Sequence, residues 1–308
     1  MHFNAAFLAV VCVSALGCQT EPNGDETQQE KAIAGIKELG GVIILDENDP
    51  QKPVVEIDIA RRIPKEALTH LQAFPKLQRL FLCFAHLDDQ SLRVLKDMVN
   101  LKELDLTGNH ITDEGLANLK RLKNVERLFL ASTHVTDRAL EDVKMFPRLQ
   151  WLDVSDTSVT DSGLTHLKGL PNLEHVGLDH TRISDAGIAH LKPLTKLRFL
   201  EVADNNITDA GLEQIYSLTR LEDIKLNKTK ITDNGLKGIK VLTSITGLGL
   251  EDTEITDRGL EHLAALRKLR IVSVNGSKVT EEGVKKLKQA LPDVRVRTVN
   301  PVSEQKPE

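Results

Sequence analysis

Cysteine and aromatic residues are scarce in this chain of 308 residues, and each scarcity excludes a class of protein. Three residues are cysteine, and Cys12 and Cys18 both lie near the amino terminus. A mature chain can therefore form at most one disulfide, and a cysteine-ligated zinc cluster is excluded. Aromatic residues make up 3% of the chain, so the core must be built from aliphatic side chains. No apolar stretch reaches the roughly 18 residues that a membrane-spanning helix requires.

The charge balance gives no reason to expect a nucleic-acid partner. Forty lysine and arginine residues face 45 aspartate and glutamate residues, which gives a net charge of −5. Such a chain gains no overall electrostatic attraction to nucleic acid or to anionic lipid. The sequence also contains no GxSxG motif, P-loop, HExxH motif or glycine-rich dinucleotide-binding turn. We therefore expect no enzyme activity, no catalytic residues, no cofactor and no metal.

The first 17 residues have the features of a secretory signal peptide. Residues 5–16 form a short apolar run whose length suits the hydrophobic region of such a peptide. The segment SALGC at 14–18 resembles the lipobox of bacterial lipoproteins, in which a small residue precedes the lipid-bearing cysteine. This resemblance implies lipidation at Cys18 and a location in the bacterial cell envelope, with plain secretion as the alternative. Residues 18–30 are polar and acidic, which predicts a flexible tether.

From Leu77 onward the sequence repeats with a period of 24 residues through residue 292. Each of the nine units follows the pattern LxxLxLxx(T/N)x(I/V)TDxGLxxLxxL. The LxLxx part alternates with period two, as a strand does, and GLxxLxxL has a period near 3.6, as a helix does. Neither element can bury its apolar stripe alone, so neighbouring units must stack. The repeat predicts an α/β leucine-rich repeat solenoid, a horseshoe with a parallel concave β-sheet and convex helices.

The ITDxGL segment resembles the cysteine-containing, ribonuclease-inhibitor-like subclass of leucine-rich repeats, over about residues 54–299. That subclass usually has cysteine or asparagine at the ninth repeat position, where this chain has mainly threonine. The resemblance implies a non-catalytic scaffold that binds a protein or peptide on its concave face, here with a membrane attachment through the lipid anchor. F-box proteins of the same subclass suggest a different function, an intracellular ubiquitin-ligase adaptor. A carbohydrate-binding module is the remaining alternative.

The segments that flank the repeats predict capping units. Residues 31–52 are expected to form an amino-terminal cap with a helix over 32–39 and a strand over 42–45. The repeats are expected to cover residues 53–292, beginning with one degenerate unit whose strand is 54–59. Residues 293–300 alternate apolar and polar side chains, which predicts a carboxy-terminal capping strand. A polar tail over 301–308 completes the chain.

Most of the recurring polar residues have a structural interpretation. The threonines of the TD pair are predicted helix N-caps, and the aspartate after each one is placed near the positive end of the helix dipole. Threonines at the ninth position are expected to hydrogen-bond to the backbone of the turn. Cys83 is expected to be a lone thiol on the sheet. Four histidines are expected on a solvated helix face: His70, His166, His190 and His262.

The concave face of the predicted sheet carries the candidate binding residues. Side chains alternate across a sheet, so the third and fifth positions of each unit point away from the core. Large aromatic residues lie at or next to these positions beside carboxylates, which is typical of a binding surface. A basic and partly apolar peptide would complement such a surface. The predicted partner-binding residues are Arg79, Phe81, Phe84, Phe129, Trp151, Asp153, His175, Phe199 and Glu201.

Two other interpretations of this face remain open from the sequence. In the first, neighbouring long side chains cover the aromatic residues, so that no hot spot is exposed. In the second, His175, Asp179 and His180 hold a divalent metal together with Asp156 or Asp204. Because strand alternation sends neighbouring side chains to opposite faces, we do not expect these ligands to converge.

Overall fold

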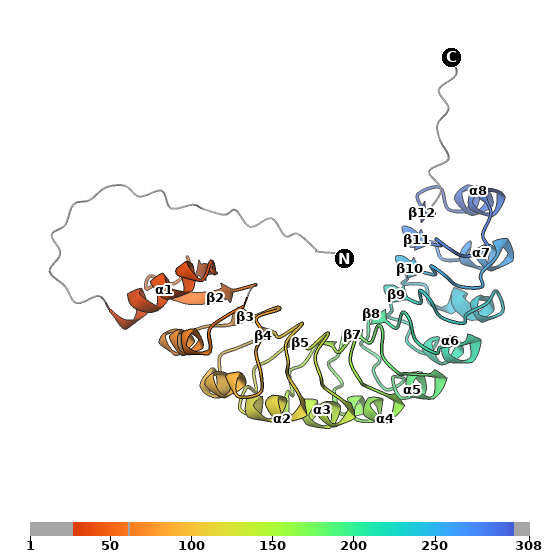
Figure 1. Ribbon diagram of the computed structural model, residues 1–308. Helices are drawn as coiled ribbons and strands as arrows, with labels where there is room; N and C mark the ends of the chain where they lie inside the picture. Colours follow the sequence, from red (N-terminus) through yellow and green to blue (C-terminus); the bar gives the residue numbers. More distant parts are fainter. Residues whose placement is uncertain (1–26, 61, 299–308) are drawn as a thin grey trace, which may run out of the picture.

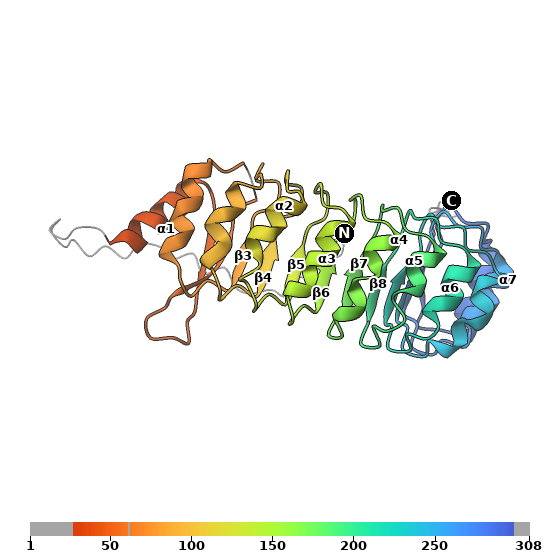
Figure 2. The same ribbon diagram turned by 90° about the horizontal axis from the view of Figure 1, so that it is seen from below.

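The computed structural model describes residues 27–60 and 62–298, which form one curved solenoid (Figure 1). It runs from helix α1 (Gln28–Glu38) at one end to helix α8 (Glu281–Ala290) at the other. Strands line the concave side of the curve, and helices lie side by side across the convex side (Figures 1 and 2). The predicted signal peptide, Cys18 and the tail over 301–308 lie outside the described residues.

A single sheet contains all twelve strands of the described chain, in sequence order. β1 pairs with β2 in the antiparallel sense, and every later pair of neighbours is parallel. The fold is therefore the predicted leucine-rich repeat solenoid with a parallel concave sheet. The strands are β1 Val42–Leu45, β2 Val54–Asp58, β3 Arg79–Phe81, β4 Glu103–Asp105, β5 Arg127–Phe129, β6 Trp151–Asp153, β7 His175–Gly177, β8 Phe199–Glu201, β9 Asp223–Lys225, β10 Gly247–Gly249, β11 Ile271–Ser273 and β12 Arg295–Arg297.

The strand register puts the two faces of the sheet where the repeat pattern expects them. Neighbouring strands pair equivalent residues of successive units, so Leu104 lies between Leu80 and Leu128. All three leucines are fully buried. Because side chains alternate along a strand, the residues before and after each central leucine face the concave side. The prediction for the third and fifth repeat positions is therefore confirmed.

The convex side holds short helices of two kinds. The sequence predicts one helix per unit, whereas the structure divides this segment between α-helix and 3₁₀ turns. Each unit must return to the sheet within its 24 residues, which leaves room for only a few turns, and 3₁₀ turns suit short pieces and helix ends. The remaining α-helices are α2 Asp113–Leu116, α3 Asp137–Asp142, α4 Asp161–Leu164, α5 Asp185–Ala189, α6 Asp209–Ile215 and α7 Asp257–Leu263; the 3₁₀ helices are η1 Lys65–Ala73, η2 Ser91–Asp97, η3 Ala117–Leu119, η4 Val143–Met145, η5 Leu167–Gly169 and η6 Gly235–Val241.

Both ends of the described solenoid are closed by capping elements. Helix α1 begins at Gln28, where Thr27 and Glu30 form a reciprocal capping box, so it includes three residues that the sequence assigns to the tether. β1 then folds back on β2, the strand of the degenerate first unit, whose convex segment is the 3₁₀ helix η1. At the other end, α8 leads into β12, which pairs with β11. β12 is shorter than the expected strand over residues 293–300.

The core is aliphatic, as the composition predicts, with two aromatic additions. Leucine, isoleucine and valine fill the space between the sheet and the convex helices. Phe74 and Phe146 are also buried there, each at the end of a convex 3₁₀ helix. A continuous apolar core of this kind is what stacking of identical units produces.

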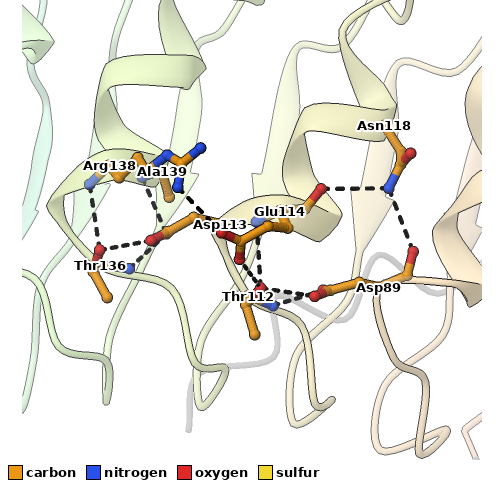
Figure 3. A network of polar contacts seen from close by, with 8 residues as sticks. All are labelled: Asp89, Thr112, Asp113, Glu114, Asn118, Thr136, Arg138 and Ala139. Atoms are coloured by element: carbon orange, nitrogen blue, oxygen red, sulfur yellow. Dashed lines mark hydrogen bonds and ion pairs between the residues drawn. The ribbon is translucent and has the colours of Figure 1, made fainter.

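An aspartate–threonine ladder joins the repeats along the solenoid. The aspartates that recur every 24 residues from Asp89 to Asp257 each accept hydrogen bonds from the backbone nitrogen and the hydroxyl of the threonine or serine 23 residues later. Asp113, for example, accepts from Thr136 N at 2.9 Å and from Thr136 Oγ1 at 2.7 Å (Figure 3). The same contacts join Asp89 to Thr112 (Figure 3) and Asp161 to Ser184.

This ladder corrects the role that the sequence gives to the aspartates. Most of the threonines are N-caps as predicted; Thr136 Oγ1, for example, accepts from the backbone nitrogen of Arg138. Thr232 is the exception, because η6 begins at Gly235 and its N-cap is Asn234. The aspartates, however, bind the next unit in addition to lying at a helix start. The ladder also explains the glycine of the TDxGL pattern: a Cβ at Gly187 would lie 2.2 Å from Asp161 Oδ1. Unit stacking thus depends on a charge-assisted contact between neighbours.

The ninth-position residues hydrogen-bond to the turn backbone as predicted. Thr133 Oγ1 donates to the carbonyl of Leu130 at 2.6 Å, and threonines of other units repeat this contact. Asn109 reaches further, because its amide nitrogen donates to Leu82 O of the preceding unit and its oxygen accepts from Leu87 N. These side chains satisfy backbone groups that would otherwise be buried without partners.

Candidate binding surface on the concave sheet

An aromatic row crosses the middle of the concave face. It consists of Phe129, Trp151, His175 and Phe199, one from each of the strands β5 to β8. The Trp151 and His175 rings are stacked with centroids 3.6 Å apart and planes 8° apart. Phe129 lies 5.8 Å from Trp151 on one side, and Phe199 lies 5.8 Å from His175 on the other. The parallel register pairs Trp151, His175 and Phe199, which are 24 positions apart in sequence. Phe129 lies diagonally to Trp151, 22 positions before it, because the register pairs Trp151 with Arg127.

Two arginines lie against rings of the aromatic row, one at Trp151 and one at Phe199. The guanidinium carbon of Arg127 is 5.8 Å from the centroid of Trp151, and that of Arg198 is 5.1 Å from the centroid of Phe199. Arg198 is also held by Glu222 and Glu174. Cation–π contacts of this kind orient the rings as well as the cations. The sequence pattern does not single out these arginines, because ring contacts depend on side-chain conformations.

At His175, the exposure of the side chain differs from what the sequence predicts. This side chain was expected to contact a partner, but only 4% of its surface is exposed because Trp151 and its neighbours cover the ring. Phe129, Trp151 and Phe199 are half-buried. The alternative in which neighbours cover the aromatic residues therefore holds for His175, while its three companions keep part of their surface exposed.

The row contains two buried polar atoms without a hydrogen-bond partner among the described residues, Trp151 Nε1 and His175 Nδ1. Such atoms are rare in folded proteins, because each lost hydrogen bond to water costs free energy. Burial also lowers the pKa of His175 to about 4. The imidazole is therefore neutral near pH 7 and behaves as part of the aromatic stack.

An acidic cluster lies beside the row, at the ends of β6 to β9. Lys225 Nζ binds Glu201 Oε1 at 2.8 Å, and the same oxygen is 3.8 Å from His175 Nε2. Asp179 is held by the backbone nitrogen of Ala203 at 2.7 Å. Burial, and after it the negative charge of Glu201, raises the pKa of Asp179 to about 6. The cluster thus contains a carboxyl that gains or loses its charge just below neutral pH.

Replacing Asp179 by asparagine is expected to have a more favourable effect on the free energy of unfolding at high pH than at low pH. The folded-state pKa lies above the ordinary value of 3.8, so ionisation of this carboxyl opposes folding as the pH rises from about 4 past 6. Relative to wild type, Asp179→Asn should therefore gain up to about 3 kcal/mol in unfolding free energy at pH 8 compared with pH 4. Urea denaturation at both pH values measures this gain, and an equal effect of the substitution at both would contradict it.

The predicted residues on β3 form a separate part of the face. Arg79 is paired with Glu56, and Phe81 is half-buried. Asp105 lies between Phe81 and Phe129 in the sheet register, so Phe81 does not join the aromatic row.

Cys83 lies close to this part of the sheet and is a free cysteine, as expected. Burial raises the pKa of its thiol far above the ordinary value, and the nearby carboxylate of Asp105 raises it further. The thiolate that a nucleophilic cysteine needs is therefore disfavoured.

Phe84 is the most exposed aromatic residue of the predicted set, with 62% of its surface accessible. It has a left-handed backbone with φ of 53°, which is an uncommon conformation for a bulky residue. The eighth position of each of the nine 24-residue units that begin at Leu77 shares this conformation, including Asp156, Asp204 and Gly108. The Phe84 ring lies over Gly108, where a Cβ would be 2.3 Å from Phe84 Cδ1.

The metal alternative on this face finds no support from the side-chain arrangement. His175 is enclosed in the aromatic row, while His180 Nδ1 is paired with Asp204 Oδ2 at 2.8 Å. Within residues 27–60 and 62–298, no group of three or more histidine, cysteine, aspartate or glutamate side chains is arranged to hold a metal ion. The two histidines considered as metal ligands from the sequence therefore lie in different surroundings and do not share one site.

Comparisons with known proteins agree with the geometry. A family model described as Leucine Rich repeat matches residues 98–120 and 194–215. Internalin C2 from Listeria monocytogenes superimposes with a TM-score of 0.53 and 21% identity, over 68% of this chain and 83% of that one. A second internalin, inlF from the same organism, gives 0.57 and 18% identity over 88% and 90% of the two chains. No curated protein matches at a significant level.

The chain therefore has a leucine-rich repeat fold, and its similarity to the two internalins is one of fold. The closer assignment to the ribonuclease-inhibitor-like subclass stays a prediction. In the described parts of the chain, no helix is both long enough and apolar enough to cross a membrane.

Proposed function

We propose that this protein is a non-catalytic scaffold that binds a protein or peptide on its concave face. Leucine-rich repeat proteins are generally protein-interaction scaffolds, and the leucine-rich repeat fold of this chain supports the same function for it. The observation that carries the proposal is the partly exposed aromatic row of Phe129, Trp151 and Phe199 beside a carboxylate cluster. Rigid aromatic side chains of this kind are the usual centres of binding energy in protein interfaces.

The chemistry of the face favours a partner with basic and apolar side chains. Asp153 on β6 and Glu201 on β8 flank the row, with β7 between their strands. Lysine or arginine side chains of a partner would pair with these carboxylates while apolar groups cover the rings. Charge complementarity would set the orientation, and burial of the rings would supply most of the affinity.

Affinity capture with matched variants tests the proposed surface. The bait is the purified protein, used on an extract of the organism from which the sequence comes. It is compared with a concave variant, Trp151→Ala with Phe129→Ala, and a convex variant, Lys144→Ala with Lys168→Ala. A partner retained by wild type and the convex variant but lost by the concave variant supports the proposal. A partner that all three proteins retain equally would count against it.

We further propose that the scaffold is attached to the bacterial envelope through lipid on Cys18. The support comes from the apolar run over residues 5–16 and the SALGC segment. Intact mass of the full-length protein made in a bacterial host, beside a Cys18→Ser variant, tests this attachment. We expect a chain that begins at Cys18 with added lipid mass, and no such species for the variant. An unprocessed wild-type chain would contradict lipidation in that host.

A further inference from the structure

Three histidines at equivalent positions form a second row, which we call the histidine row. His86, His110 and His134 each occupy the tenth position of consecutive units, in the turn that follows the strand. All three are exposed. Ring centroids are 6.1 Å apart between His86 and His110 and 5.7 Å apart between His110 and His134. The sequence shows this row as a 24-residue spacing, but the residues predicted to form a binding site do not include it.

His110 and His134 face each other through ring nitrogens. His110 Nδ1 lies 3.5 Å from His134 Nε2, and the two ring planes differ by 27°. The backbone beneath both rings is fixed, because the nitrogen of His110 donates to Leu87 O and that of His134 donates to Ile111 O, each at 2.8 Å. The solenoid therefore holds two imidazoles at a defined separation on its surface, one from each of two neighbouring units.

The separation of the two nitrogens matches one edge of a tetrahedral metal site. Two nitrogens that each bind tetrahedral Zn²⁺ at about 2.05 Å lie about 3.4 Å apart, close to the 3.5 Å between His110 and His134. A neutral imidazole can carry its proton on either nitrogen, so both facing nitrogens can present a lone pair.

We propose that His110 and His134 form a surface site for a divalent late transition metal ion, with water completing the coordination. Imidazole nitrogen favours Zn²⁺, Cu²⁺ and Ni²⁺ over Mg²⁺ and Ca²⁺, which prefer oxygen ligands. The site has two protein ligands, consistent with the finding that the described residues hold no metal-binding group of three or more. A bound ion would link two units on a surface separate from the aromatic row.

Zinc titration by calorimetry tests the site on the full chain without a purification tag. The comparison includes His110→Asn, His134→Asn and a control, His190→Asn, which removes an exposed histidine at the end of α5. Each of the first two substitutions should weaken one equivalent of Zn²⁺ binding by at least about tenfold, since losing even an outer-shell partner costs about 10–100-fold. The control should bind as wild type does. Acidification should also weaken this equivalent, because ligating imidazoles must be deprotonated.

Two results would overturn the proposal. One is the absence of zinc binding by the wild-type chain. The other is binding that is unchanged in both His110→Asn and His134→Asn, which would assign the ion to other ligands. A titration with Mg²⁺ tests the specificity of the site. If the wild-type chain gave a binding heat with Mg²⁺ and both His110→Asn and His134→Asn lost it, the preference for a late transition metal would be contradicted.

Discussion

Replacing Leu164 by alanine is expected to lower the free energy of unfolding by about 2–5 kcal/mol. Leu164 is fully buried at the end of α4, between the sheet and the neighbouring units. Removing its side chain leaves a cavity that the repeats on both sides cannot readily fill, because each unit contacts only its neighbours. Chemical denaturation followed by circular dichroism measures the loss.

The matched control for this substitution is Lys168→Ala, four residues further along the same convex segment. Lys168 is exposed, so its replacement is expected to change stability by no more than about 0.5 kcal/mol. Equal stability of Leu164→Ala and wild type would mean that Leu164 does not occupy a core position and that the 24-residue register is wrong.

Replacing both Trp151 and Phe129 by alanine is expected to weaken partner binding by at least about 3 kcal/mol, or roughly a hundredfold in Kd. The two rings are in contact at a centroid distance of 5.8 Å, and both are partly exposed on the concave face. Their removal takes away the centre of the proposed interface while the carboxylates around it remain. Calorimetric titration of a captured partner measures the change.

This binding prediction requires that the double variant remain folded. Trp151 also covers His175, so its loss exposes an imidazole that is otherwise buried, and some loss of stability is expected. Circular dichroism at the titration temperature provides the check, with Lys144→Ala plus Lys168→Ala as the folded reference. A folded double variant with wild-type affinity would exclude the aromatic row as the binding centre.

The repeat pattern predicts the fold because its signals are local. Leu80, Leu104 and Leu128 recur at the same position, and burial of one requires burial of all. The aspartate ladder could not be predicted in the same way. Asp161 and its partner Ser184 lie in different units, and their contact depends on how far one unit is displaced relative to the next.

The candidate site was predictable in position and not in detail. Strand alternation places Trp151 and Phe199 on the concave face, as the register confirms. It does not show that the His175 ring stacks against Trp151 and becomes buried, because stacking depends on side-chain rotation. The left-handed backbone of Phe84 is not evident from its own residue type, because bulky residues seldom adopt it; only the glycine and aspartate at the same position of other units point to it.

Site-specific photo-crosslinking tests the central claim, the binding of a partner to the concave face, most directly. A benzophenone amino acid replaces Arg127, which lies over the Trp151 ring, or Lys168, which is exposed on the convex helices. We expect the captured partner to crosslink to position 127 and not to position 168. Crosslinks from position 168 alone would contradict it and place the partner on the convex side.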